Sequence, residues 1–375
     1  MTEQEAPIVV AFGSFHFQIT ESAPEMFTGA EYLGWTEDAL GAISAVVDIS
    51  IDADDTYGKA EFRRPLKLDE FSETQMYFPP LQFVEIAFNL HVPARVQRSL
   101  FEDDVDAELQ LGEDFEIRIH DGWQMSLAMI RPIKAQEGAD ASDAVVMVRR
   151  LLQGEFERLK DHRVTFECLG PSPAHFSAEL APASNSQSQA FERASHVREG
   201  YDRYRFWCRT PMRSEAEVAD AFFFRLNEEL DLLYRMAAAR VRALRAWQSA
   251  VNRIEEILRA YRADGWAAVV GRARQGRKIN QALVAIAELE LTQLEDKRTF
   301  DREFRSVYET GKSGLIREVL ADDLDEFEPY PISPLTSLLE LLEAGRRTRR
   351  DVLIAAMASL IAAAVAALAT LIAAG

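Results

Sequence analysis

The first two hundred residues alternate apolar and polar positions with a period of two. From Val84 to Val92 every second residue is apolar, and most residues between them are polar. Such alternation is typical of a strand with one face in a core and the other in solvent. The pair Asp121-Gly122 separates two alternating runs, which predicts a β-hairpin. Further strands are expected at residues 8–12, 15–19, 45–51, 164–168 and 176–180.

The pattern changes to a helical period near residue 213. Ser214 and Glu217 have the spacing of a capping box, in which each side chain satisfies a free backbone amide at a helix start. Apolar residues then recur at steps of three and four until Tyr261, and a second such run spans about 275–309. Together the two runs predict an antiparallel helical hairpin with coiled-coil-like packing. A shorter helix, starting near Ser142, is expected among the strands.

The C-terminal segment from Val352 to Ala374 has 23 residues and no charge. A bilayer core of roughly 30 Å needs about 20 apolar helical residues, so this length predicts a transmembrane helix. Eleven of the 23 positions are alanine, and a buried alanine-rich core helix is therefore the alternative. The residues expected to drive insertion are Val352, Leu353, Ile354, Leu360, Ile361, Leu368, Leu371 and Ile372.

Two further patterns surround this segment. Basic residues stay on the cytoplasmic side of a membrane, and four arginines precede the segment. They predict a tail-anchored, single-pass protein of a cell inner membrane with a cytoplasmic N-terminus. Small residues spaced four apart allow close helix packing in lipid, so they predict a homo-oligomer, unless the spacing arises by chance. The arginines are Arg346, Arg347, Arg349 and Arg350, and the small residues are Ala355, Ser359, Ala363 and Ala367.

The predicted fold class is α+β with four successive regions. An acidic, mainly antiparallel β-rich head with one embedded helix covers residues 1–212, and the long helical hairpin covers 213–328. A juxtamembrane segment at 329–351 is broken by prolines, which cannot continue a helix. The single transmembrane helix at 352–374 completes the chain.

Charge restricts the partners of the head. The chain has a net charge of −19, and residues 1–150 hold 28 acidic against 11 basic side chains. An acidic surface repels nucleic acid, whose binding depends on Lys and Arg, so no nucleic acid is expected as a partner. A protein partner of the head and membrane lipid at the C-terminus are expected instead. The alternative is that the charge only keeps the head soluble.

One basic stretch interrupts the acidic chain at the expected tip of the hairpin. It consists of Arg272, Arg274, Arg277 and Lys278, with glycines at 271 and 276. A solvated connection between two helices is the favoured interpretation, because the stretch has only four charges. The alternative is a contact with an anion, namely anionic lipid, phosphate or nucleic acid.

The chain shows no catalytic motif, and neither a cofactor nor a metal is predicted. Its two cysteines, Cys168 and Cys208, sit in alternating strand patterns, which favour buried apolar roles over a nucleophile. The run from Asp52 to Gly58 fails as a calcium loop because Arg63 stands where a bidentate Glu is required. The histidines lack metal-ligand spacing. With no signal peptide and no disulfide framework, a reducing cytoplasm is expected, and the composition suggests a bacterial source.

These observations predict a non-enzymatic, membrane-anchored protein. Its cytoplasmic head would recognise a partner or signal, and the helical hairpin would couple the head to the anchor. One alternative is an effector of the toxin or defence type, whose alanine-rich helix oligomerises and permeabilises the bilayer. A second alternative is an enzyme whose site is assembled only in space within the head.

Overall fold

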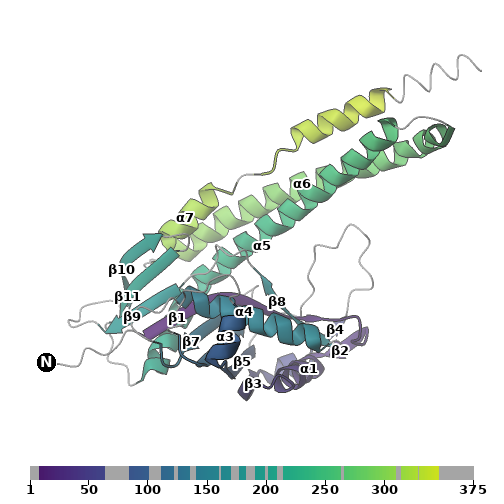
Figure 1. Ribbon diagram of the computed structural model, residues 1–375. Coiled ribbons are helices and arrows are strands. Elements are labelled where there is room, and N and C mark those ends of the chain that lie inside the picture. Colours follow the sequence, from purple (N-terminus) through teal and green to yellow (C-terminus); the bar gives the residue numbers. More distant parts are fainter. Residues whose placement is uncertain are drawn as a thin grey trace, which may run out of the picture. The chain divides into compact units, whose positions relative to one another are not determined.

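The computed structural model shows an α+β protein with a curled, mainly antiparallel sheet (Figure 1). It describes residues 8–63, 84–100, 111–121, 126–135, 141–159, 162–169, 177–182, 191–198, 202–208, 214–262, 266–309, 314–327 and 329–345. The chain divides into two compact units, each with its own core. The first consists of Met1–Val241 and Thr299–Phe327, and the second of Arg242–Arg298 and Glu328–Gly375.

Nine strands of the described residues form one sheet in the first unit. Its order is β10-β11-β9-β1-β7-β6-β5-β3, with β8 also paired to β1. All of its pairs are antiparallel except β9 with β11. The strands are β1 (Ile8–Ile19), β3 (Val46–Ala53), β5 (Val84–His91), β6 (Asp114–Asp121), β7 (Ser126–Pro132), β8 (Val164–Leu169), β9 (Ser177–Pro182), β10 (Phe191–Arg198) and β11 (Asp202–Cys208).

Strand β1 joins two predicted strands into one of 12 residues. It pairs with β7 along one edge, and with β9 and then β8 along the other. The strand runs unbroken through Gly13 and Ser14, which lie between the two predicted ranges. Pairing with β7 continues through both residues and satisfies their backbone groups.

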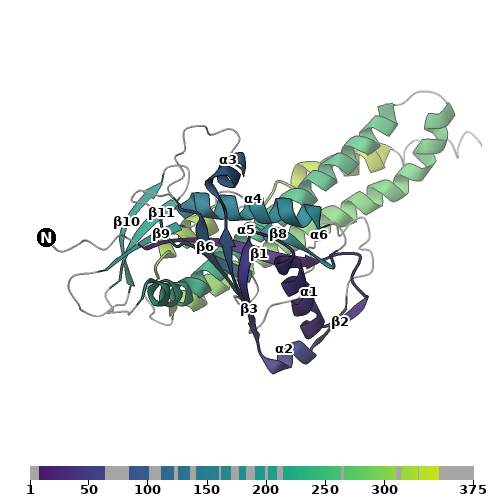
Figure 2. The same cartoon turned by 60° about the horizontal axis from the view of Figure 1, so that its bottom comes forward.

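One face of the sheet is covered by helices α1 (Gly29–Gly41), α3 (Ala94–Leu100) and α4 (Ala141–Arg158) (Figure 2). Apolar residues of β1, β5 and β6 on this face pack with these helices in one core. Helix α1 was not predicted, although Thr28 and Glu31 form a full capping box at its start. A smaller sheet pairs β2 (Met26–Thr28) with β4 (Glu61–Arg63), and the short helix α2 (Asp55–Lys59) begins in the rejected calcium loop.

The opposite face forms a second core with the long helix α5 (Glu215–Arg262). Ser214 caps this helix, since its hydroxyl accepts a hydrogen bond from the Glu217 amide at 3.2 Å. Val10 and Phe12 of β1 face α5, and the Phe12 ring lies 5.8 Å from that of Phe222. Residues 299–309 of α6 (Trp266–Glu309) and helix α7 (Arg317–Asp325) complete this core.

The second unit is helical. Residues 242–262 of α5, residues 266–298 of α6 and a helix at 333–345 share a core that includes Ile254, Ile286 and Leu339. Tyr330 stacks on Trp247 at 5.7 Å and donates its amide to the Gln293 side chain at 2.7 Å. Long amphipathic helices therefore bury their apolar sides against each other, as coiled-coil-like packing requires.

No helix among the described residues has an apolar stretch long enough to cross a bilayer. The predicted fold class is therefore wrong in its single C-terminal transmembrane helix. The described helices carry charges along their length and bury their apolar sides in protein cores. Alanine adds little to transfer into lipid, and it fills eleven positions of Val352–Ala374. That segment lies outside the described residues, and so do the arginines at 346–350 and the small residues predicted to pair in lipid.

Candidate functional site

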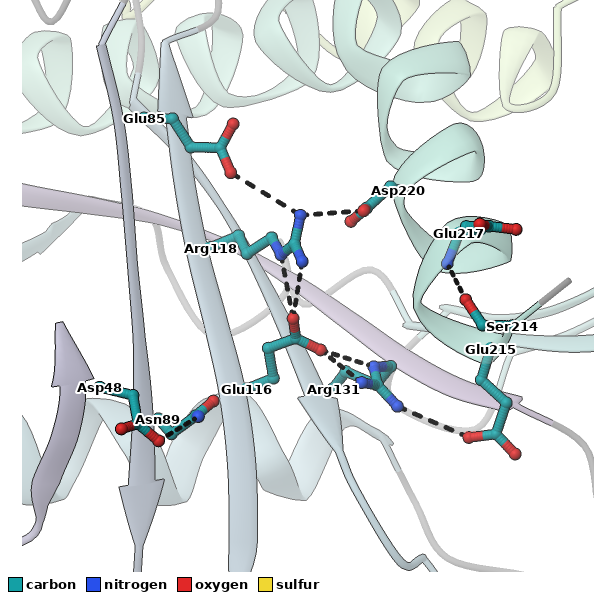
Figure 3. A network of polar contacts seen from close by, with 10 residues as sticks. All are labelled: Asp48, Glu85, Asn89, Glu116, Arg118, Arg131, Ser214, Glu215, Glu217 and Asp220. Carbon is teal, nitrogen blue, oxygen red and sulfur yellow. Dashed lines mark hydrogen bonds and ion pairs between the residues drawn. The ribbon is translucent and has the colours of Figure 1, made fainter. Parts of the chain in front are cut away.

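A group of charged side chains lies on the α5 side of strands β3, β5 and β6. Strand alternation places them there, because the intervening residues Ile86, Ile117 and Ile119 point into the opposite core. We call this group the charged face. It consists of Asp48, Glu85, Glu116, Arg118, Arg131 and Asp220 (Figure 3), together with Asp52, the direct partner of Glu85 on β3.

Two arginines connect the charged face. Arg118 donates to Glu116 at 2.9 Å and to Asp220 of α5 at 2.9 Å, and it lies 3.7 Å from Glu85 (Figure 3). Arg131 donates to the other Glu116 oxygen at 2.9 Å through its Nε atom. Both guanidinium groups are thus held in place by carboxylates from the sheet and from α5. Forked arginine–carboxylate contacts of this kind give rigidity as well as attraction.

The carboxylates of this network differ in their proton affinity. Burial by itself raises the pKa of Glu116, but hydrogen bonds and charges from Arg131 and Arg118 outweigh it and lower that pKa. Burial raises the pKa of Asp220, and Arg118 offsets only part of this effect. Glu116 is therefore a structural anion with both oxygens engaged, which disfavours a role as a general base.

Two carboxylates at the outer part of the charged face oppose each other. Asp52 of β3 and Glu85 of β5 are direct partners in the antiparallel register, so their side chains lie on the same face. Like charges opposite each other destabilise a sheet, and Arg118 approaches only Glu85. Asp52 is exposed, and within the described residues it has no ion pair. Among the described residues, the two carboxylates of this pair therefore have a single cation nearby, Arg118.

An aromatic residue and a histidine border the charged face. Phe224 of α5 is 57% exposed, and its ring lies edge-on to His120 at 5.4 Å. Burial lowers the pKa of His120, against a smaller opposite effect of Glu85. The Nδ1 atom of His120 is buried and has no hydrogen-bond partner among the described residues. The apolar ring of Phe224 thus lies beside His120, whose direct partner on β5 is Glu85.

Strand β3 is an edge of the sheet as far as the described residues show, and it carries a β-bulge between Val47 and Ser50. Asp48 within the bulge has a φ of 53°, and its carboxylate accepts a hydrogen bond from Asn89 at 3.2 Å. A bulge interrupts the regular row of backbone donors and acceptors, which opposes the addition of another strand. The exposed side chains of the face, rather than the strand edge, are therefore available to a partner.

A buried Ser–His pair elsewhere in the sheet has the wrong proton order for catalysis. The Ser14 hydroxyl donates to the Ser126 carbonyl at 3.0 Å, so it accepts from Nε2 of His16 at 2.7 Å. A catalytic histidine would instead take the proton of the serine. Burial also lowers the pKa of His16 to about 3. The pair is a polar contact within the sheet.

The remaining predicted residues do not gather at this site. Cys168 packs against the core beneath α4, and burial raises the pKa of its thiol to about 11, which suppresses the reactive thiolate. Cys208 is also buried. The basic stretch at 272–278 lies within α6, which begins at Trp266 rather than near residue 275. Of its described side chains, Arg277 and Lys278 are exposed, and Lys278 lies 3.8 Å from Glu256.

The charged face was only partly visible in the sequence. Alternation placed Glu85, Glu116, Arg118 and His120 on the polar sides of their strands. Their meeting with Asp220 depends on the docking of α5 onto the sheet, over a separation of 102 residues from Arg118. No local signal in the sequence reports such a contact.

No family model, no curated protein and no solved structure matches this chain. Within the described residues, no group of His, Cys, Asp or Glu side chains is arranged to hold a metal ion. The fold and the charged face thus define an α+β domain with a surface of mixed charge on which carboxylates outnumber arginines.

Proposed function

We propose that this protein is a non-enzymatic binding module whose first unit recognises a basic segment of a protein partner on the charged face. The observation that carries the proposal is the Asp52–Glu85 pair, two opposed carboxylates of which, among the described residues, only Glu85 lies near a cation, Arg118. A Lys or Arg side chain placed between them removes their repulsion and gains two charge-assisted hydrogen bonds. Exposed Phe224 offers an apolar contact next to His120, the direct partner of Glu85 on β6, as aromatic residues do in interfaces.

The rigidity of the charged face supports a binding role rather than a catalytic one. The inner members of the face, Glu116 and Arg131, are held by several hydrogen bonds and change little when a ligand arrives. A preorganised surface loses less conformational entropy on binding. The strongly acidic head is in keeping with this choice, because it attracts basic partners over distances of about 10 Å at ordinary salt concentration. The helical hairpin would connect the module to the rest of its assembly.

The test is a quantitative affinity capture with three forms of the full chain. The first is unchanged, the second carries Asp52→Lys with Glu85→Lys, and the third carries Glu37→Lys with Asp38→Lys on α1. The control pair is exposed, reverses the same charge and lies on the helix that covers the opposite face. We expect a captured protein that the unchanged and control forms retain, that salt releases, and that the face variant loses at least about tenfold. Identical capture by all three forms would contradict the proposal.

A further inference from the structure

Helix α6 carries an exposed apolar stripe on the side that faces away from the core of the second unit. Val284, Leu291 and Leu294 are 57%, 61% and 42% exposed, and Ala287 between them is exposed as well. We call these four residues the α6 stripe. The opposite side of the same helix supplies Ile279, Ala282, Ile286 and Leu289 to the core. The helix thus has two apolar sides, and the described residues cover only one.

The spacing of the stripe matches a coiled-coil seam. Its residues follow one another at steps of three, four and three, which is the alternation of a and d positions in a heptad. Scattered exposed apolar residues are normal on a protein surface, but a regular seam along one helix marks a surface for another helix. Such a seam is recognised by a partner with anchors at i, i+3 and i+7.

Charge at the borders of the stripe decides the kind of partner. At about 100° per residue, Glu288 and Glu295 lie along one border and Glu290 along the other. All three are exposed, and no described residue forms an ion pair with them. These are the e and g positions that select coiled-coil partners. The α6 stripe is therefore an apolar seam between acidic borders.

A second copy of this chain fits the seam poorly. In a parallel pair, Glu290 of one helix would face Glu295 of the other, because g positions oppose the e positions five residues later. In an antiparallel pair, e faces e and g faces g, which again places glutamates together. Both arrangements set like charges side by side, which is how natural coiled coils reject a partner.

We infer that the α6 stripe is a docking site for an amphipathic helix of another protein, with apolar a and d residues and Lys or Arg at its e and g positions. Such a helix covers the four stripe residues and neutralises the three glutamates. The site lies in the second unit and is independent of the charged face in the first. Either site can be lost without the other.

The test uses a synthetic peptide of about three heptads with Leu at a and d and Lys at e and g, and a matched peptide with Glu at e and g. Binding to the full chain is followed by fluorescence anisotropy. We expect the Lys peptide to bind at least about tenfold more tightly than the Glu peptide, and Leu291→Ser with Leu294→Ser to weaken it at least about tenfold. Met26→Ser, a similarly exposed apolar residue in the first unit, should leave binding unchanged.

A charge-reversed variant tests whether misfolding, rather than loss of the seam, explains weaker binding by the serine variant. Changing Glu288, Glu290 and Glu295 to Lys keeps the apolar seam and should reverse the preference, so that the Glu peptide binds more tightly. Equal affinity for both peptides, or an unchanged preference in this variant, would overturn the inference. So would an unchanged chain that sediments as a dimer and becomes a monomer on the Leu291→Ser and Leu294→Ser changes, because a second copy would then occupy the stripe.

Discussion

At the scale of single residues, buried ionisable groups in the first unit are fixed in one protonation state by burial. Ser14 and His16 show this in β1, where the imidazole donates to the hydroxyl and burial lowers the pKa of the imidazole, so that it stays neutral. Charging His16 would require an unsolvated cation in the sheet, and its pKa is therefore about 3 instead of 6.5. The folded chain binds fewer protons than the unfolded chain between these two values.

His16→Gln tests this role. Because the folded pKa is lowered, the stabilisation is complete above the unfolded pKa and is lost as the pH falls toward 3. In the unchanged chain, protonation of His16 in the unfolded state should therefore lower the free energy of unfolding by about 2 kcal/mol as the pH falls from about 7 to about 5. Glutamine keeps a donor for Ser14 but does not titrate, so urea unfolding of the variant should show a shallower loss over this range. If the unfolding free energies of the two proteins fell equally with pH over this range, His16 would not be the group that titrates.

At the scale of elements, one carboxylate ties together three helices of the first unit. Glu229 of α5 is buried, and it accepts hydrogen bonds from the Tyr308 hydroxyl of α6 at 2.6 Å and the Leu315 amide at 2.9 Å. The amide of Ile316, just before α7, approaches it at 3.3 Å. A side chain at Gly314 would collide with this carboxylate, since an added Cβ lies 2.7 Å from its Oε1 atom. The connection from α6 to α7 therefore depends on one acid and one glycine.

Glu229→Gln should change how stability depends on pH. Burial raises the pKa of Glu229, against smaller lowering by its hydrogen bonds. An acid with a raised folded pKa stabilises fully below its unfolded pKa, and this contribution is lost as the pH rises through the folded pKa. Glutamine does not titrate, so the variant does not lose this stabilisation. The difference in unfolding free energy, variant minus unchanged chain, should therefore rise with pH from about 4 to about 8.

Exposed Glu37→Gln removes the same charge from α1 of the first unit and serves as the control. In urea titrations across the same pH range, its difference from the unchanged chain should stay nearly constant. A pH trend of equal size in both variants would show that the effect comes from net charge and not from the buried hydrogen bonds.

At the scale of the whole molecule, the two units have separate cores although α5 and α6 run through both. Ile254→Ala removes buried methyl groups from the second core and should cost about 2–4 kcal/mol there. Hydrogen exchange should show the loss of protection at residues 242–298, with amides of β6 and β7 unchanged. Val284→Ala, an exposed change in the same unit, should have little effect. If Ile254→Ala lowered protection in β6 as much as at residues 242–298, the two units would unfold as one cooperative unit.

The sequence alone determined those features that depend on local periodicity. Alternation located β5 and β8, and the Ser214 cap with its steps of three and four located the start of α5, because these patterns are set by backbone geometry within one element. It also placed Glu85 and Arg118 on polar sides of their strands. The same reasoning missed α1, whose capping box was present at Thr28, because this helix is stabilised mainly by its packing on β3 and α2.

Only the tertiary structure decided which polar residues meet. Arg118 reaches Asp220 because α5 docks on the sheet, and Asp52 opposes Glu85 because β3 pairs with β5 in one register. The prediction of a transmembrane helix failed at the same level, because an uncharged, alanine-rich run has the length of a bilayer span whatever surrounds it in space. Length and periodicity are local properties, whereas the docking of α5 and the register of β3 are set by contacts between residues far apart in the chain.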